Sequence, residues 1–120
     1  MVLWGYMKLS DKKCIPCEGG ATAMVHDDIM TYMNDVPGWI LEDDQKITRT
    51  WMFPDFVHAM KFINMVADIA EKDGHHPDIF VSYNRVVIDL WTHSIRGLSE
   101  NDFIVAAKIN AIEREGGHMN

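Results

Sequence analysis

The spacing of apolar residues changes several times along the chain, and each change predicts a new element. Between residues 22 and 36 the apolar positions recur at helical intervals, and Pro37-Gly38 ends the pattern. These positions are Val25, Ile29, Met33 and Val36. From Pro54-Asp55 to Asp73-Gly74 a wider stripe predicts the longest helix. The stripe is broad enough to face both the protein's own core and a second subunit, and burial in the core alone is the equal alternative. The stripe consists of Phe56, Ala59, Met60, Ile63, Val66, Ala67 and Ala70, with Phe62, Met65 and Ile69 beside it.

Two pairs of shorter segments have the alternation or the β-branched and aromatic content of strands. Residues 39–41 and 45–53 flank the acidic turn 42–44 and predict one hairpin. Residues 79–83 and 86–91 predict a second hairpin, with Asn84-Arg85 as a two-residue turn. In the first hairpin, one face of the longer strand carries Ile47, Arg49, Trp51 and Phe53. In the second hairpin, the predicted turn fixes the register and pairs Ile79 with Leu90, Val81 with Ile88 and Tyr83 with Val86. The same register would place His76 opposite His93. Pro77 counts against the last pair, because proline cannot donate to a sheet ladder.

A third helix is predicted from Ser99, its N-cap, to about Arg114, because Ser99 and Asp102 resemble a capping box in which Asp replaces the usual Glu or Gln. The resulting order, α-β-β-α-β-β-α, predicts an α+β fold with a four-stranded antiparallel sheet and three helices packed on one face. We expect an irregular N-terminal extension over residues 1–21, one domain over 22–115, and a flexible C-terminal tail over 116–120.

Composition narrows the class of protein. At 120 residues with 48% hydrophobic content, the chain has the size of one domain, and its formal charge of -7 counts against a nucleic-acid partner. No apolar run approaches the ~20 residues that cross a bilayer, and no signal peptide is evident, so we expect no membrane partner and a cytoplasmic location. Cys14 and Cys17 are interpreted as a free pair, because no further ligands complete a zinc site. A zinc shared between subunits and a redox role are the alternatives.

The candidate chemistry lies in three histidines, His75 and His76 directly before Pro77 and His93 further on. Imidazole both gives and takes a proton near neutral pH, so three imidazoles predict proton transfer. Around them, fixed intervals separate Glu71, His75-His76-Pro77, Tyr83, His93 and Asp102, and similar context is found at Gly38-Trp39, residues 83–86, Thr92-His93 and residues 97–99. With this pattern the chain resembles the pterin-4a-carbinolamine dehydratases over about residues 22–115.

The resemblance implies a hydro-lyase that converts a 4a-hydroxytetrahydropterin to the quinonoid dihydropterin, in support of cofactor recycling for aromatic amino-acid hydroxylases. Loss of hydroxide from C4a needs an acid at the oxygen, while the neighbouring ring nitrogen must give a proton to a base. We expect His75 and His93 to do this acid-base work and His76 to bind substrate with a share in proton transfer. No metal and no cofactor are expected.

The resemblance also implies which residues surround the substrate. The expected binding residues are Gly74, His75, His76, Trp91, Thr92, His93 and Ser94. Glu71 and Asp102 are expected to support them, Glu71 by orienting an imidazole and Asp102 mainly by capping its helix. The other histidines, at positions 26, 58 and 118, are expected on the surface.

Two other functions remain open. His75, His76 and His93 with Asp89 or Asp102 could hold a metal ion, although adjacent histidines in an extended segment point to opposite faces. A non-catalytic protein-binding module is the second, because some animal relatives also act as the dimerisation partner of a homeodomain transcription factor. The helix over residues 55–72 and the sheet edges are expected to form a homodimer or homotetramer, and a functional link to an aromatic amino-acid hydroxylase is expected.

Overall fold

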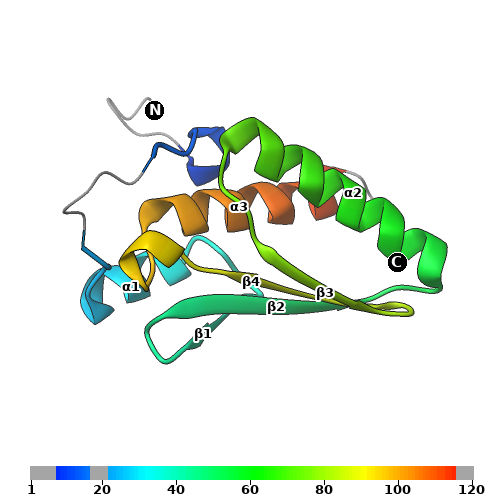
Figure 1. Cartoon of the computed structure of the whole chain (residues 1–120), viewed down its shortest axis with the longest axis horizontal. Helices are drawn as coiled ribbons and strands as arrows, with labels where there is room; N and C mark the ends of the chain where they lie inside the picture. The colour runs from blue at the N-terminus through cyan, green and yellow to red at the C-terminus, as the bar shows by residue number, and fades with distance from the viewer. Residues whose placement is uncertain (1–7, 17–21, 116–120) are drawn as a thin grey trace.

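Four strands form one antiparallel sheet, in the order β1-β2-β4-β3. The structure is a computed structural model that describes residues 8–16 and 22–115. In chain order its elements are the 3-10 turn η1 (Leu9–Asp11), α1 (His26–Met33), β1 (Ile40–Glu42), β2 (Lys46–Met52), α2 (Phe56–Asp73), β3 (Asp78–Ser82), β4 (Arg85–Leu90), the 3-10 turn η2 (His93–Ile95) and α3 (Glu100–Glu115). Figure 1 shows α2 and α3 lying over one face of the sheet. The predicted α+β class and element order are confirmed.

The helix α2 begins and ends where the sequence predicts. The Asp55 side chain caps it by accepting a hydrogen bond of 2.9 Å from the His58 backbone N–H. It ends at Gly74, whose φ of 66° lies in the left-handed region that favours glycine. The buried face is narrower than the predicted stripe, since Phe56 and Ala67 are exposed. Its apolar members are Ala59, Phe62, Val66 and Ala70. The sheet and α3 cover only one side of the helix, which leaves the rest of the stripe at the surface.

The second hairpin has a different register from the predicted one, which was wrong by two residues. The pairs are Ile79–Ile88 and Val81–Val86, in place of Ile79–Leu90, Val81–Ile88 and Tyr83–Val86. Its turn is Tyr83-Asn84, with Tyr83 at a φ of 53°. Phe53 donates its backbone N–H to the Asn84 carbonyl, and the Asn84 amide donates to the Phe53 carbonyl, both at 2.8 Å. This contact with the chain just beyond β2 favours the observed turn, and local turn rules do not include it.

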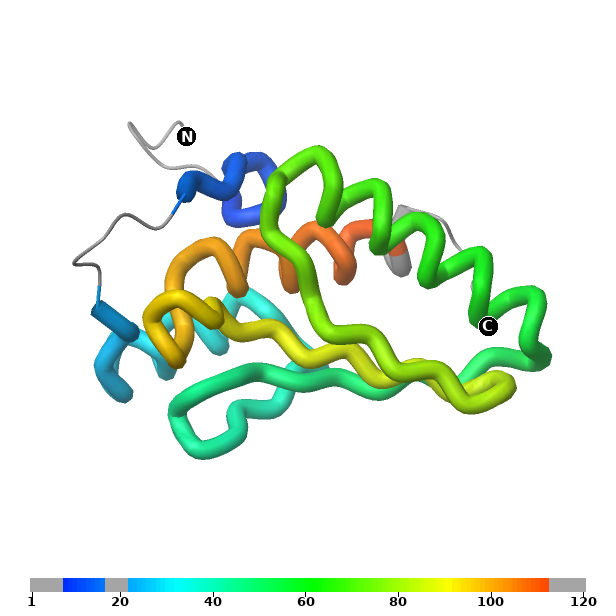
Figure 2. Tube along the Cα trace, viewed as in Figure 1, coloured from blue at the N-terminus to red at the C-terminus, as the bar shows by residue number. Residues whose placement is uncertain are grey.

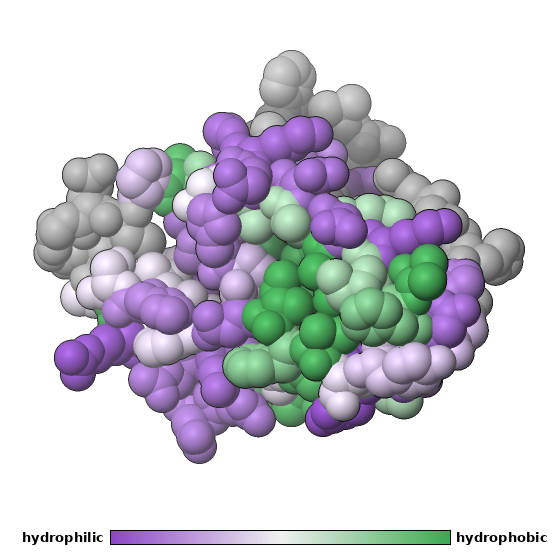
Figure 3. All heavy atoms as spheres, turned by 45° about the vertical axis from the view of Figure 1, so that its right-hand side comes forward, coloured by the Kyte–Doolittle hydropathy of each residue, from purple (hydrophilic) through white to green (hydrophobic). Residues whose placement is uncertain are grey.

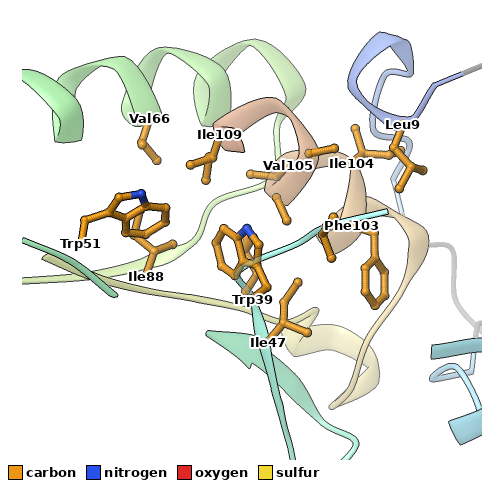
Figure 4. Close-up of a cluster of buried hydrophobic side chains, with 14 of the residues drawn as sticks. Leu9, Trp39, Ile47, Trp51, Val66, Ile88, Phe103, Ile104, Val105 and Ile109 are labelled. Carbon is orange, nitrogen blue, oxygen red and sulfur yellow. The ribbon is translucent and has the colours of Figure 1, made fainter. Parts of the chain in front are cut away.

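One apolar cluster joins the sheet to the helices. Trp51 and Ile88 from the sheet face Val66 of α2 and Ile109 of α3 (Figure 4). Leu9, from the N-terminal segment, belongs to the same cluster.

Two shorter segments, α1 and residues 8–16, pack against the helices that cover the sheet. In α1, Ile29 is fully buried, and Tyr32 stacks on Phe103 of α3 with ring centroids 5.1 Å apart. The segment 8–16 runs beside the carboxyl end of α2 and the first turns of α3 (Figure 2). Among the helices of the described ranges, none is long and apolar enough to cross a membrane. The predicted C-terminal tail lies outside the described residues.

Candidate active site

A pocket of about 250 Å³ opens where α2 ends, β4 ends and α3 begins. Its position follows from the fold, since the chain leaves α2 at Gly74 and reaches α3 through η2 and Ser99. The pocket is lined by Ile15, Pro16, Gly74, His75, His76, Trp91, Thr92, His93, Ser94 and Asn101. All seven residues expected to bind substrate therefore lie on one cavity.

His75 is the most buried of the three histidines, with 12% of its side chain exposed. Its Nε2 lies 2.7 Å from Oδ1 of Asp102. Because a carboxylate only accepts hydrogen bonds, Nε2 carries the hydrogen, and in the neutral ring the lone pair is on Nδ1. Among the described residues Nδ1 has no hydrogen-bond partner, so it is the ring nitrogen left for a ligand.

Asp102 is fully buried and does more than the predicted helix capping. Its Oδ2 accepts from the Ser99 backbone N–H at 3.0 Å, which is the capping contact, and also from the Thr92 hydroxyl at 2.8 Å. Together with the contact to His75, one carboxylate holds the ends of three elements. Asp102 thus fixes the orientation of the imidazole, a role that the sequence reasoning considered for Glu71.

Glu71 does contact an imidazole, that of His76. Its Oε2 lies 2.6 Å from Nε2 of His76, and the two side chains are 76% and 61% exposed. Water competes with such an exposed pair, so it orients the ring far less firmly than a buried carboxylate does.

His93 lies in η2, and its ring packs at a tilt against an indole. Its ring centroid is 4.1 Å from that of Trp91, at an interplanar angle of 30°. Asp78 serves both rings, since its Oδ2 accepts from Trp91 Nε1 at 3.1 Å and lies 3.8 Å from His93 Nε2. Each of the three imidazoles therefore has a carboxylate beside it.

The predicted direct pairing of His76 with His93 is wrong. β3 begins at Asp78 and β4 ends at Leu90, so neither histidine is in the ladder, and Pro77 lies in the connection as its chemistry requires. The two histidines share the pocket because η2 turns the chain back after Thr92, which pairs with Gly97 in an isolated bridge.

Four residues around the site were missed by the sequence reasoning. Asp78 belongs to no motif in the sequence, and nothing there indicates that it accepts a hydrogen bond from Trp91. Ile15, Pro16 and Asn101 line the pocket, and the Asn101 amide bonds both backbone groups of Ile15, at 3.1 Å to its N–H and 2.5 Å to its carbonyl. In the sequence, Ile15 and Pro16 are two apolar residues at the end of a mostly polar segment, which gives little signal for a place in the site.

Cys14 directly precedes Ile15 and is buried as a free thiol. Burial, and then the nearby Asp73 carboxylate, raise the pKa of the Cys14 thiol to about 12. Cys17 lies outside the described residues, so the interpretation of the two as a pair stays a prediction.

No group of three or more His, Cys, Asp or Glu side chains within the described ranges is arranged to hold a metal ion. Two of the other histidines, His26 and His58, are away from the pocket and each contacts an aspartate, Asp44 and Asp55 respectively. His118 lies outside the described residues.

Known proteins resemble this chain over most of its length. The model of the family described as pterin 4 alpha carbinolamine dehydratase matches residues 22–112. The chain belongs to that family. Its members are hydro-lyases by name, so the predicted enzyme class is confirmed at the level of the family. The match begins after Ile15 and Pro16, so these two residues line the pocket but lie outside the part of the chain that the family model covers.

Individual relatives cover most of the chain. A protein of Rickettsia bellii (strain OSU 85-389), provisionally named as a pterin-4-alpha-carbinolamine dehydratase, is 41% identical over 88% of this chain and 94% of its own length. Pterin-4-alpha-carbinolamine dehydratase 2, mitochondrial, of Arabidopsis thaliana is 46% identical over 89% of this chain and 60% of its own. The crystal structure of a transcriptional coactivator/pterin dehydratase from Brucella melitensis covers 76% of this chain and 98% of its own, with a TM-score of 0.71 and 37% identity.

Proposed function

We propose that this protein removes water from a 4a-hydroxytetrahydropterin and releases the quinonoid dihydropterin, in the recycling of the cofactor used by aromatic amino-acid hydroxylases. The observation that carries the proposal is the convergence of His75, His76 and His93 on one pocket, each beside a carboxylate. Membership in the dehydratase family gives the reaction class, and the proton chemistry of the pocket fits it.

In the proposed mechanism His75 is the base. Its lone pair on Nδ1 takes the proton from the ring nitrogen next to C4a, and the electrons left on that nitrogen form the double bond to C4a. The C4a–O bond breaks as His93, in its protonated form, gives a proton to the leaving oxygen, which departs as water. His76, at the open side of the pocket, binds the ring and returns protons to solvent. Bound substrate and acid-base groups held in one pocket favour the reaction by proximity.

The buried Asp102 supports the assignment of His75 as the base. A proton taken up on Nδ1 gives the ring a positive charge, and the carboxylate 2.7 Å from Nε2 stabilises that charge. The Nε2 of His93 lies 3.8 Å from Oδ2 of Asp78, beyond hydrogen-bond distance, which leaves its N–H to donate to the leaving oxygen in the same pocket.

The direct test follows the decay of the 4a-hydroxypterin spectroscopically. An aromatic amino-acid hydroxylase generates the compound, and the decay is compared with and without this protein. We expect faster decay with the wild type, and none of this acceleration with His75→Ala or His93→Ala. His26→Ala is the matched control, since His26 also contacts an aspartate but lies away from the pocket. An unchanged decay with the wild-type protein refutes the proposal.

We also propose that the protein forms a homodimer or homotetramer through α2 and the β3 edge of the sheet. Exposed apolar side chains gather there, on the side of the molecule that Figure 3 brings forward. They include Phe56, Val57 and Met65 on α2 and Phe80 and Val81 on β3. Sedimentation velocity tests this, and Val57→Glu is expected to shift the protein to monomers with the fold intact. A monomeric wild type excludes the assembly. A cytoplasmic location stays a prediction of the sequence.

A further inference from the structure

The short segment 12–16 is fixed to the start of α3 by contacts along its length. Lys12 forms an ion pair with Glu100 at 2.8 Å, and Glu100 also accepts from the Tyr32 hydroxyl at 3.0 Å. The Cys14 thiol is buried and contacts the Asn101 carbonyl oxygen at 3.6 Å. These contacts lie on the side of the segment that faces α3.

Asn101 holds the next residue in the manner of a neighbouring strand. Its Oδ1 accepts from the Ile15 backbone N–H, and its Nδ2 donates to the Ile15 carbonyl. Both backbone groups of Ile15 are thereby satisfied by one buried side chain. The backbone of Ile15 is fixed, yet its own side chain is 70% exposed.

That exposed side chain lines the pocket together with Pro16. Most of the other lining side chains are polar, so Ile15 and Pro16 supply apolar surface that the imidazoles and hydroxyls do not. A pterin has the matching asymmetry, with hydrogen-bonding groups along the pyrimidine edge and carbon at positions 6 and 7 of the other ring.

We propose that Ile15 and Pro16 form an apolar wall against the carbon-6 side of the bound pterin, and that Asn101 is the positioning residue that holds this wall in place. The proposal rests on the proposed function for the nature of the ligand. It makes residues 12–16 part of the substrate site and a determinant of which carbon-6 substituents are accepted.

Kinetics with matched variants test the wall. Because the wall contacts substrate and transition state alike and moves no proton, Ile15→Ala should raise KM about tenfold and leave kcat nearly unchanged. Ile40→Ala is the control, since Ile40 is also exposed but lies on β1, away from the pocket. The proposal also expects Ile15→Ala to lower the preference between pterins that differ only at carbon 6. An unchanged KM and an unchanged preference overturn it.

The role of Asn101 is tested in the same way. Asn101→Ala should reproduce the rise in KM seen with Ile15→Ala. Asn110→Ala is the control for a general loss of stability, because Asn110 is an equally buried asparagine on α3 that bonds Trp39 and the Pro37 carbonyl instead. If both asparagine variants raise KM equally, Asn101 is not a positioning residue.

The Cys14 thiol reports docking of the segment without any turnover. In a Cys17→Ser background, alkylation of Cys14 requires the segment to leave α3. Asn101→Ala removes two hydrogen bonds and should speed alkylation on the order of thirtyfold. A stable dihydropterin at ten times its Kd should slow alkylation by up to about tenfold, because a ligand that contacts the wall favours the docked state. Ile15→Ala should weaken this protection.

The two proposals fail in different ways. If the wild-type protein does not accelerate pterin dehydration, the proposed function is refuted. The alkylation experiment still shows whether Asn101 holds the segment 12–16 against α3. If the wild type is active but Ile15→Ala changes neither KM nor the protection of the thiol, the proposed function stands and the proposed wall is refuted.

Discussion

Replacement of Asp102 with asparagine tests how His75 is oriented. The change keeps the size of the side chain and exchanges one carboxylate oxygen for an amide N–H₂ group. Two donors, the Thr92 hydroxyl and the Ser99 backbone N–H, lie on Oδ2, so the remaining oxygen is expected to stay with them. The new N–H₂ group then faces Nε2 of His75.

The consequence for His75 is a change of tautomer. An amide N–H donates to Nε2, so the ring must carry its hydrogen on Nδ1, and the lone pair that acts as base is lost from the pocket. A general acid–base group contributes about 10²–10⁴ to the rate, so kcat should fall by that range. The free energy of unfolding should fall by only about 1–2 kcal/mol, because a charged hydrogen bond becomes a neutral one.

Asp102→Ala shows why asparagine is the better variant. Alanine removes the acceptor of the buried Thr92 hydroxyl and of the partly buried His75 ring and Ser99 N–H, and the free energy of unfolding should fall by about 3–5 kcal/mol. Loss of activity would then follow from a damaged fold. The assay combines urea unfolding, decay of the 4a-hydroxypterin, and ¹⁵N shifts of the His75 ring to read its tautomer. A folded asparagine variant with wild-type kcat, or with the hydrogen still on Nε2, refutes the orientation argument.

Three further predictions address the exposed carboxylate, a helix cap and a close contact. Glu71→Gln should change kcat/KM less than about tenfold, because its contact with His76 is exposed; a loss of the size predicted for the buried carboxylate would contradict this. The Asp55 pKa is lowered from 3.8 chiefly by the backbone N–H bond at the start of α2, so its stabilising effect is complete above that value and is lost as pH falls through the folded pKa. Urea unfolding of wild type and Asp55→Asn should therefore differ at neutral pH and converge as pH falls through the folded pKa of Asp55; a difference that persists in acid excludes the charge effect. A Cβ on Gly97 would lie 2.5 Å from that of Ala23, so Gly97→Ala should cost about 1–3 kcal/mol of stability. Adding Ala23→Gly should restore the melting temperature, and failure to do so would place the strain elsewhere.

The helices and strands were predictable because burial of one face requires apolar residues at regular intervals in the sequence. Asp55 and Gly74 bound α2 through local capping chemistry, which acts within one turn and is visible in the sequence. The register of the second hairpin was not predictable in this way. Asn84 is held by Phe53, which is distant along the chain, and that contact outweighs the local preference of the turn.

The residues of the site also divide into those that the sequence pattern predicts and those that depend on packing between distant parts of the chain. The sequence pattern around the site is short and recognisable, and its three histidines line the pocket together with Thr92 and Ser94. Asp78 and Asn101 act through contacts that depend on the final packing, with Trp91 in one case and the backbone of Ile15 in the other. Neither residue type nor spacing distinguishes them from ordinary polar residues at the ends of elements.

The meeting of two helix ends explains why this corner of the fold suits proton transfer. His75 follows the carboxyl end of α2, where the partial negative charge of the helix favours a cation. Asp102 lies in the first turn of α3, where the partial positive charge favours an anion. The geometry therefore stabilises the pair most when His75 has taken up a proton and Asp102 remains a carboxylate, which is the state that the proposed base must reach as water leaves the substrate.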